Sequence, residues 1–167
     1  MSKHYQELHC ELTYIIGELQ QSVYELITHA NGNHVIQQFL LMFRASDKPG
    51  DKDMDGTSQL AIYTNFIFQS CMANCDEIGS DKHGCCVMQR CLEKGLLSQK
   101  LALSEVIISR LHFMIEDQYG NYLVQNVIKL KNETMNEQIL NFIAGDFTRL
   151  SQLKFSSNVI EKCLETV

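Results

Sequence analysis

Hydrophobic residues recur along the chain in groups that occupy positions i, i+1, i+4 and i+5, and four of these groups follow a Gly or Ser. This spacing places the four side chains on one side of an α-helix. The pattern predicts helices over 33–43, 85–94, 121–130 and 157–165, each with an apolar stripe. The stripe residues are Val35, Ile36, Phe39 and Leu40; Val87, Met88, Cys91 and Leu92; Leu123, Val124, Val127 and Ile128; Val159, Ile160, Cys163 and Leu164.

Longer amphipathic segments lie between these groups, at 12–27, 60–72, 97–115 and 135–150. Each is long enough for one helix, or for two short helices joined at a kink. The Gly or Ser positions are 32, 84, 120 and 156, so the last two intervals are 36 residues and the first is 52. A period in the range of about 20–50 residues is typical of repeat arrays. Because one such unit cannot bury its apolar side alone, the sequence predicts an all-α solenoid of about four stacked repeats.

The longer first interval has an evident source in residues 46–59. This segment is polar, contains Pro49, the single proline of the chain, and is interrupted by Gly50 and Gly56. Such a composition indicates a surface loop. A long loop adds little closure entropy, so the repeats on either side can still stack. We therefore expect one repeat domain over 1–167, with an inserted loop at 46–59.

The other side of each predicted helix carries polar residues at fixed places. Pairs at i and i+4 lie on one side of a helix. The pairs are Asn33 and Gln37, Cys85 and Gln89, Asn121 and Gln125, and Ser157 and Glu161; the residue after each first member is His34, Cys86, Tyr122 or Asn158. Amides both donate and accept hydrogen bonds, and carboxylates accept them. Planar side chains stack on bases, so the pattern indicates a surface that reads single-stranded RNA.

The octets at 30–37, 82–89, 118–125 and 154–161 resemble the recognition helices of the Pumilio (PUF) family. The strings at 117–122 and 157–163 are highly typical of that family. The resemblance covers about residues 12–167, and the order of the octets is similar to the fourth to seventh of the family's eight repeats. It departs from the family at Cys86, where Arg or an aromatic residue is common. The chain also stops at or just after the fourth recognition helix, so a partial domain without its end caps is expected.

The resemblance implies that the first and last residues of each repeat's set read the base edge and that the middle residue stacks. It also implies recognition helices on the concave side and RNA running antiparallel to the chain, with the predicted core 5′-GUAU-3′. The implied role is repression of messenger RNAs through their 3′ untranslated regions, with deadenylase or translational-repressor proteins as partners. No cofactor is implied, and the chain is not expected to be an enzyme.

Composition modifies this picture at a few points. The net charge of −6 counts against nucleic-acid binding, which favours Lys and Arg, although four of the acidic residues lie within 47–55. Net charge also says little about any one surface. No apolar run approaches the ~18–20 residues of a membrane span, and no apolar segment follows Met1 as in a signal peptide. The seven cysteines are an odd number, which favours reduced thiols and a cytoplasmic location.

Other functions fit parts of the sequence less well. A HEAT- or armadillo-like scaffold that binds protein would share the helical pattern but would not require the repeated amide pairs. Zinc could use Cys71, Cys75, Cys85, Cys86 and His83, but no CxxC pair occurs, and Cys91 and Cys163 occupy apolar stripe positions.

Two further alternatives involve single motifs. Asp51, Asp53, Asp55 and Gly56 resemble the start of an EF-hand, but Ile62 stands where the calcium-binding Glu is needed. His83 beside Cys85 is a conceivable nucleophile pair, but its position at a helix start within a repeat disfavours that role.

Overall fold

The computed structural model describes residues 13–43 and 59–166, and within these ranges it contains helices and no strand. Four repeats follow one another, each with three helical segments. The first holds residues 13–21, α2 (Val23–Thr28) and α3 (Gly32–Met42); the second α4 (Gln59–Ala73), α5 (Cys75–Gly79) and α6 (Lys82–Lys94); the third α7 (Leu97–Ser109), α8 (Leu111–Met114) and α9 (Gly120–Lys129); the fourth α10 (Glu133–Gly145), α11 (Phe147–Gln152) and α12 (Ser156–Thr166).

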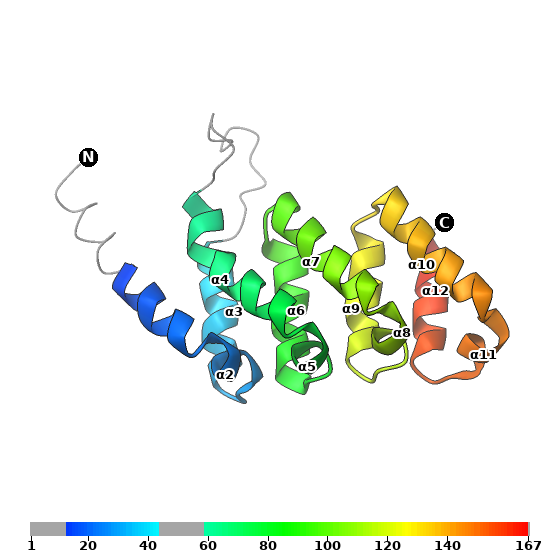
Figure 1. Ribbon diagram of the computed structural model, residues 1–167, viewed down its shortest axis with the longest axis horizontal. Helices are drawn as coiled ribbons and strands as arrows, with labels where there is room; N and C mark the ends of the chain where they lie inside the picture. The colour runs from blue at the N-terminus through cyan, green and yellow to red at the C-terminus, as the bar shows by residue number, and fades with distance from the viewer. Residues whose placement is uncertain (1–12, 44–58, 167) are drawn as a thin grey trace.

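The repeats stack side by side in chain order (Figure 1). Helices α3, α6, α9 and α12 form one layer in which each helix packs on the next. Helices α4, α7 and α10 form a second layer, and the short helices α5, α8 and α11 lead from the second layer back to the first (Figure 1). The predicted all-α solenoid is confirmed. The predicted loop at 46–59 lies outside the described residues except for Gln59, which is the first residue of α4.

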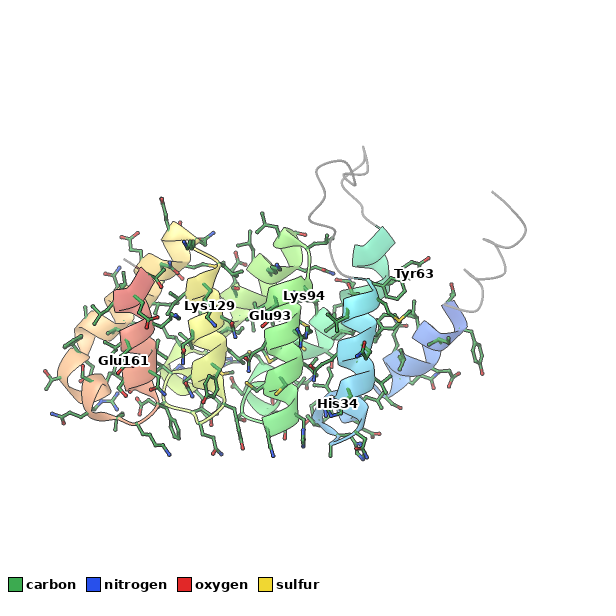
Figure 2. The ribbon with its side chains drawn as sticks, turned by 180° about the vertical axis from the view of Figure 1, so that it is seen from behind. His34, Tyr63, Glu93, Lys94, Lys129 and Glu161 are labelled. Atoms are coloured by element: carbon green, nitrogen blue, oxygen red, sulfur yellow. The ribbon has the colours of Figure 1, made fainter. Side chains whose placement is uncertain are left out.

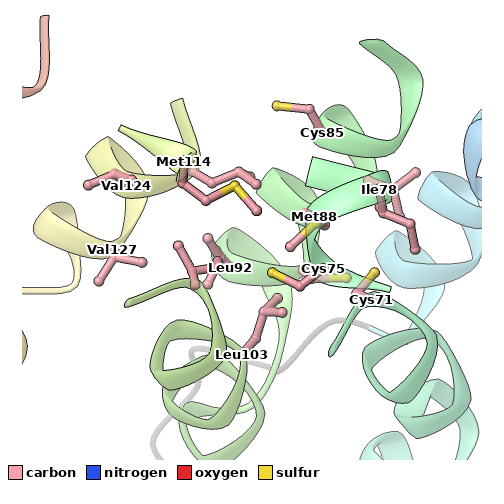
Figure 3. Packing of buried hydrophobic residues seen from close by; sticks show 14 of the residues in the cluster. Cys71, Cys75, Ile78, Cys85, Met88, Leu92, Leu103, Met114, Val124 and Val127 are labelled. Atoms are coloured by element: carbon pink, nitrogen blue, oxygen red, sulfur yellow. The ribbon is translucent and has the colours of Figure 1, made fainter. Parts of the chain in front are cut away.

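Most of the predicted stripe residues belong to the continuous core, together with side chains of the second layer and the short helices. Figure 3 shows Leu92 of α6 near Leu103 and Val127 of the third repeat, and Met88 of α6 near Met114 of the same repeat. Two stripe residues were predicted wrongly: Val35 in the first repeat and Leu164 in the fourth are exposed. Val35 lies in the first and Leu164 in the fourth of the described repeats, and within the described residues no further repeat packs against either side chain.

The recurring Gly is explained by a close approach between helices. A Cβ atom at Gly32, Gly84 or Gly120 would lie 2.9, 2.4 or 2.9 Å from a backbone carbonyl oxygen of the preceding short-helix segment. In the fourth repeat the position is Ser156, whose hydroxyl donates to the equivalent carbonyl oxygen, that of Leu150, at 2.6 Å. The chain therefore accepts a side chain here when it replaces a steric clash with a hydrogen bond.

The first-layer helices begin one to three residues earlier than predicted, and at three of them a side chain upstream accepts hydrogen bonds from backbone amides at the helix start. Asp81 Oδ1 accepts hydrogen bonds from the amides of His83 and Gly84, at 2.8 and 2.7 Å. Asp117 does the same for Tyr119 and Gly120, and His29 Nδ1 accepts from Asn31 and Gly32 in the first repeat. These bonds satisfy amides that a helix start leaves without partners.

Among the described residues, no helix has the length and apolar character needed to cross a membrane.

Candidate RNA-binding surface

Three of the four predicted base-edge pairs are joined by the same hydrogen bond. The side-chain amide of Gln37 donates to Asn33 Oδ1 at 2.9 Å, and Gln125 donates to Asn121 Oδ1 at 3.1 Å. In the second repeat Gln89 donates to Cys85 Sγ, also at 3.1 Å. The first residue of each pair thus fixes the amide of the glutamine one turn later. Each glutamine keeps one N–H and its carbonyl oxygen for another partner.

Asn33 and Asn121 are buried, unlike the exposed base-reading residues that the sequence alone suggested. The amide nitrogen of Asn121 donates to the carbonyl oxygens of Asp117 and Gln118 at 2.9 and 3.1 Å. Asn33 makes the equivalent two bonds, to His29 and Ala30. Both amide hydrogens are therefore used within the protein, so the half-buried glutamine is the member of each pair that presents polar atoms outward.

Cys85 links two repeats. It is buried, and its thiol donates to the carbonyl oxygen of Tyr119 in the next repeat, 3.2 Å away. Burial raises the pKa of the Cys85 thiol from 9.0 to about 12, with a smaller opposing effect from the hydrogen bond of Gln89. The group is therefore a neutral thiol at physiological pH. This inter-repeat bond had no signal in the sequence, because a Cys at a polar position also fits simple packing.

The fourth pair is arranged differently. The Ser157 hydroxyl donates to the carbonyl oxygen of Lys154 at 3.3 Å, and Glu161 is exposed on the outer side of α12 (Figure 2). No hydrogen bond joins Ser157 to Glu161 among those of the described residues. Glu161 thus offers both carboxylate oxygens to a ligand.

The four predicted stacking residues share one surface. His34, Cys86, Tyr122 and Asn158 are all exposed. They lie at equivalent places on α3, α6, α9 and α12, which run side by side (Figure 2). We call the exposed side of these four helices the recognition surface. All twelve predicted site residues belong to these four helices.

Two ion pairs lie within helices of the recognition surface. Arg90 Nη1 lies 2.9 Å from Glu93 Oε2, and Lys162 Nζ lies 2.5 Å from Glu165 Oε2. The ammonium of Lys129 donates to Asn126 Oδ1 at 3.2 Å. Figure 2 shows acidic Glu93 and Glu161 on the same layer as Lys94 and Lys129. The surface is polar and mixed in charge, with no continuous basic stripe among the described residues.

The cysteines carry no metal-site geometry in the part of the chain that is described. No group of three His, Cys, Asp or Glu side chains gathers there closely enough to hold an ion. Burial raises the pKa of the Cys75 thiol to about 12 and also raises that of Cys163. Cys91 and Cys163 are buried, as their stripe positions predict. The EF-hand-like residues 51–56 lie outside the described residues.

Similarity to known proteins agrees with this geometry. Four segments of the chain, 22–43, 74–108, 114–144 and 150–167, match the model of the Pumilio-family RNA-binding repeat, and together they make up more than half of its length. The chain belongs to the Pumilio family of RNA-binding repeat proteins. Each matched segment contains one of the helices α3, α6, α9 and α12. The segment boundaries are offset from the repeats as grouped above, since 74–108 spans α5, α6 and most of α7.

Individual Pumilio-family proteins resemble the chain over most of its length. Pumilio homolog 12 of Arabidopsis thaliana is 35% identical over 155 residues, which are 93% of this chain and 23% of the relative. Pumilio homology domain family member 4 of Saccharomyces cerevisiae is 31% identical over 160 residues, 93% of this chain and 16% of the relative. The chain therefore spans less than a quarter of the length of these relatives.

Solved Pumilio-family structures have the same fold. The Puf4 RNA-binding domain bound to the HO endonuclease RNA 3′ UTR recognition sequence superposes with a TM-score of 0.77 at 32% identity, covering 93% of this chain and 45% of that one. PUF-8 in complex with PBE-RNA superposes with a TM-score of 0.75 at 31% identity, covering 91% and 40%.

Proposed function

We propose that this chain binds single-stranded RNA along the recognition surface and reads one base with each repeat. The observation that carries the proposal is the hydrogen bond repeated in three of the four pairs, which holds Gln37, Gln89 and Gln125 in one orientation. Beside each glutamine an exposed residue offers a place for stacking. A scaffold for proteins has no need to fix three amides in this way, whereas a nucleobase edge requires it.

The chemistry of each pair supports the sequence 5′-GUAU-3′. A fixed glutamine with one free N–H and one free carbonyl oxygen complements uracil O4 and N3–H, which suits Gln125 and Gln37. The same amide also complements the adenine edge, and the smaller Cys85 leaves more room for a purine beside Gln89. Glu161 only accepts hydrogen bonds, and guanine offers two adjacent donors, N1–H and N2–H₂. A carboxylate facing carbonyl oxygens would stay unpaired.

Stacking completes the proposed binding mode. Tyr122 and His34 are planar and exposed, so they can lie against bases on either side. Cys86 supplies a weaker contact at the second repeat. Four bases at about 1–3 kcal/mol each must offset the several kcal/mol lost on association. We therefore expect the isolated chain to bind weakly.

The wider role follows from the family. RNA-binding repeats of this type and the 3′ UTR sequence bound by the similar Puf4 domain support messenger-RNA 3′ untranslated regions as the target. We extend the proposal to post-transcriptional repression in the cytoplasm, through deadenylase or translational-repressor proteins and without an enzymatic activity of the chain itself.

A competition titration tests the proposal. Labelled RNA containing GUAU is bound to the chain and displaced by unlabelled RNAs that differ at one letter, at two salt concentrations. Loss of displacement after each single change supports base reading, since non-specific phosphate binding is insensitive to sequence and strongly sensitive to salt. Equal displacement by all competitors would assign the surface to another ligand, with a protein scaffold as the next function to test.

A further inference from the structure

The buried thiol of Cys85 is bonded differently from the first residues of the other three pairs. It donates to the carbonyl oxygen of Tyr119, in the next repeat, at 3.2 Å. Asn33 and Asn121 donate both amide hydrogens to carbonyl oxygens of the segment just before their own helix. The Ser157 hydroxyl also donates within its own repeat. Of the four first residues, Cys85 alone therefore bonds across a junction between repeats.

The Cys85 thiol is the middle of a continuous path of hydrogen bonds. On one side, the side-chain amide of Gln89 donates to Cys85 Sγ at 3.1 Å. On the other side, the carbonyl oxygen of Tyr119 that accepts from the thiol also accepts from the backbone amide of Tyr122, at 3.1 Å. The path joins the proposed base-reading residue of the second repeat to the proposed stacking residue of the third. Cys85 is 2% exposed, so water does not compete for these partners.

The backbone of Tyr119 also supports the base-reading pair of the third repeat. The Tyr119 amide donates to Asp117 Oδ1 at 2.8 Å, and Asn121 donates to the Asp117 carbonyl oxygen at 2.9 Å. Asn121 in turn accepts from the Gln125 amide at 3.1 Å. A shift of the Tyr119 backbone would therefore reach both Tyr122 and Gln125.

This path can carry the effect of a bound base from α6 to α9. Hydrogen bonds that form a chain in a low-dielectric environment polarise and strengthen one another. A base held by the free N–H and carbonyl oxygen of Gln89 would fix that amide and strengthen its bond to Cys85. The thiol, which burial keeps protonated, would then be a better donor to Tyr119. The first turn of α9 would be held more firmly as a result.

We propose that Cys85 is a positioning residue that couples the second and third repeats, so that the A at Gln89 and the U at Gln125 are bound cooperatively. The inference rests on the proposed RNA binding and adds to it a dependence between two neighbouring letters. Asn33 and Asn121, the first residues at the other two junctions, have no amide hydrogen left for the next repeat. We expect the letters read across those junctions to contribute independently.

Titration of the whole chain with four RNAs tests the coupling. The RNAs contain GUAU, GCAU, GUGU and GCGU, so the U read by the third repeat and the A read by the second are changed singly and together. We expect the double change to weaken binding at least about twofold less than the product of the two single effects. As a control, changes of the first two letters, read by the fourth and third repeats, should have effects that multiply.

Variants of the thiol show whether the coupling passes through it. Cys85→Ala removes both side-chain bonds, so the effects of the two letters should then multiply. Cys85→Ser should retain the coupling, because a hydroxyl can accept from Gln89 and donate to Tyr119. The matched control is Cys75→Ala, which truncates another buried thiol of the same repeat and should leave the coupling unchanged. Thermal melts verify folding, and Cys85→Val, which fills the space without a polar group, replaces Cys85→Ala if that variant unfolds.

The outcomes separate this inference from the proposed function. Binding that ignores every letter would refute the proposed function and the inference with it. Binding that responds to each letter, with effects that multiply at every junction, would refute the inference alone. Coupling that persists in Cys85→Ala, or that Cys75→Ala abolishes equally, would also overturn the inference, because the Cys85 thiol would then not be its carrier.

Discussion

Asn121 holds Gln125 in place: the glutamine amide donates to Asn121 Oδ1 at 3.1 Å, and the buried asparagine is itself fixed by two backbone carbonyl oxygens. The buried Asn121 therefore sets the orientation of the outward-facing Gln125 amide. Asn33 and Gln37 repeat this arrangement. In the proposed binding mode Asn33 and Asn121 orient the glutamines that face the RNA, and within the protein they bond backbone carbonyl oxygens at the start of the helix.

This division of roles predicts different effects for the two residues. Asn121→Ala should lower the free energy of unfolding by about 1–3 kcal/mol, because it leaves buried carbonyl groups without partners. It should also weaken RNA binding several-fold through the freed glutamine. Gln125→Ala should weaken binding similarly with little loss of stability, since the residue is half-buried. Urea unfolding and RNA titration of both variants check this, and equal stability losses would contradict it.

Because of the close approach at Gly84, replacing this glycine with alanine should lower the stability of the fold instead of raising it. Alanine normally stabilises a helix relative to glycine, but a Cβ at Gly84 would lie 2.4 Å from the carbonyl oxygen of Ile78. We expect Gly84→Ala to destabilise the fold by about 1–3 kcal/mol. Gly145→Ala is the control, because nothing lies within 4 Å of its Cβ position; it should be neutral or stabilising by up to about 1 kcal/mol. Thermal melts distinguish the two, and equal effects would show that the contact is not restrictive.

The repeat period and the apolar stripes were sufficient to predict the all-α solenoid, because both follow directly from helical geometry. The exposure of Val35 and Leu164 was not predicted, since a stripe indicates which side of a helix is apolar but not whether a neighbour covers it. The early start of α6 was missed for a local reason: Asp81 caps the helix, and an isolated Asp in a polar segment does not reveal which amides it will accept from.

The candidate site was predicted in part. The i, i+4 spacing correctly predicted that both members of each pair lie on one side of the helix. It could not separate the buried Asn121 from the more exposed Gln125, because both are amides and burial depends on the loop that precedes the helix. The hydrogen bond from the Cys85 thiol to the carbonyl oxygen of Tyr119 joins two repeats. Such a contact cannot be predicted until the stacking geometry of the repeats is known.

The raised thiol pKa values predict a loss of stability at alkaline pH. Burial, with a smaller effect from Asp76, raises the pKa of Cys75 from 9.0 to about 12. Between these values the unfolded chain loses the thiol proton and the folded chain keeps it. The free energy of unfolding therefore falls as pH rises, by up to about 1.4 kcal/mol per pH unit for this group.

Cys75→Ala isolates this contribution from other titrating groups. The variant should be less stable than the unmodified chain at neutral pH, because a buried side chain is truncated. The difference should narrow as the pH rises above 9.0, where only the unmodified chain loses stability through this thiol. Urea midpoints at neutral pH and at about pH 10 measure the change. A difference that stays constant would show that Cys75 titrates normally in the folded state.

The paired charges on the recognition surface predict a shallow salt dependence for RNA binding. Arg90 Nη1 lies 2.9 Å from Glu93 Oε2, so the carboxylate offsets much of the positive charge that Arg90 could offer a phosphate. Glu93→Gln should release Arg90 and strengthen RNA binding at low salt. For one added phosphate contact, the slope of the logarithm of the binding constant against the logarithm of the salt concentration should become steeper by about 0.7. Glu137→Gln makes the same change in net charge on α10, in the other layer, and should have little effect. Identical effects of the two variants would indicate a response to net charge alone.

The base preference of the fourth repeat should be exchangeable in two steps. Glu161 is exposed and is not held by Ser157, whose hydroxyl bonds Lys154 instead. Glu161→Gln alone should abolish the preference for G but yield only a weak preference for U, because Ser157 is not seen to hold the side chain at this position. Adding Ser157→Asn should supply the missing support, as Asn121 does for Gln125, and change the preferred letter from G to U. Competition between RNAs that differ at that letter measures both steps, with Asn158→Ala as a control that weakens stacking without changing the letter. A double variant that still prefers G would refute the assignment of this base to the fourth repeat, even if the chain binds RNA.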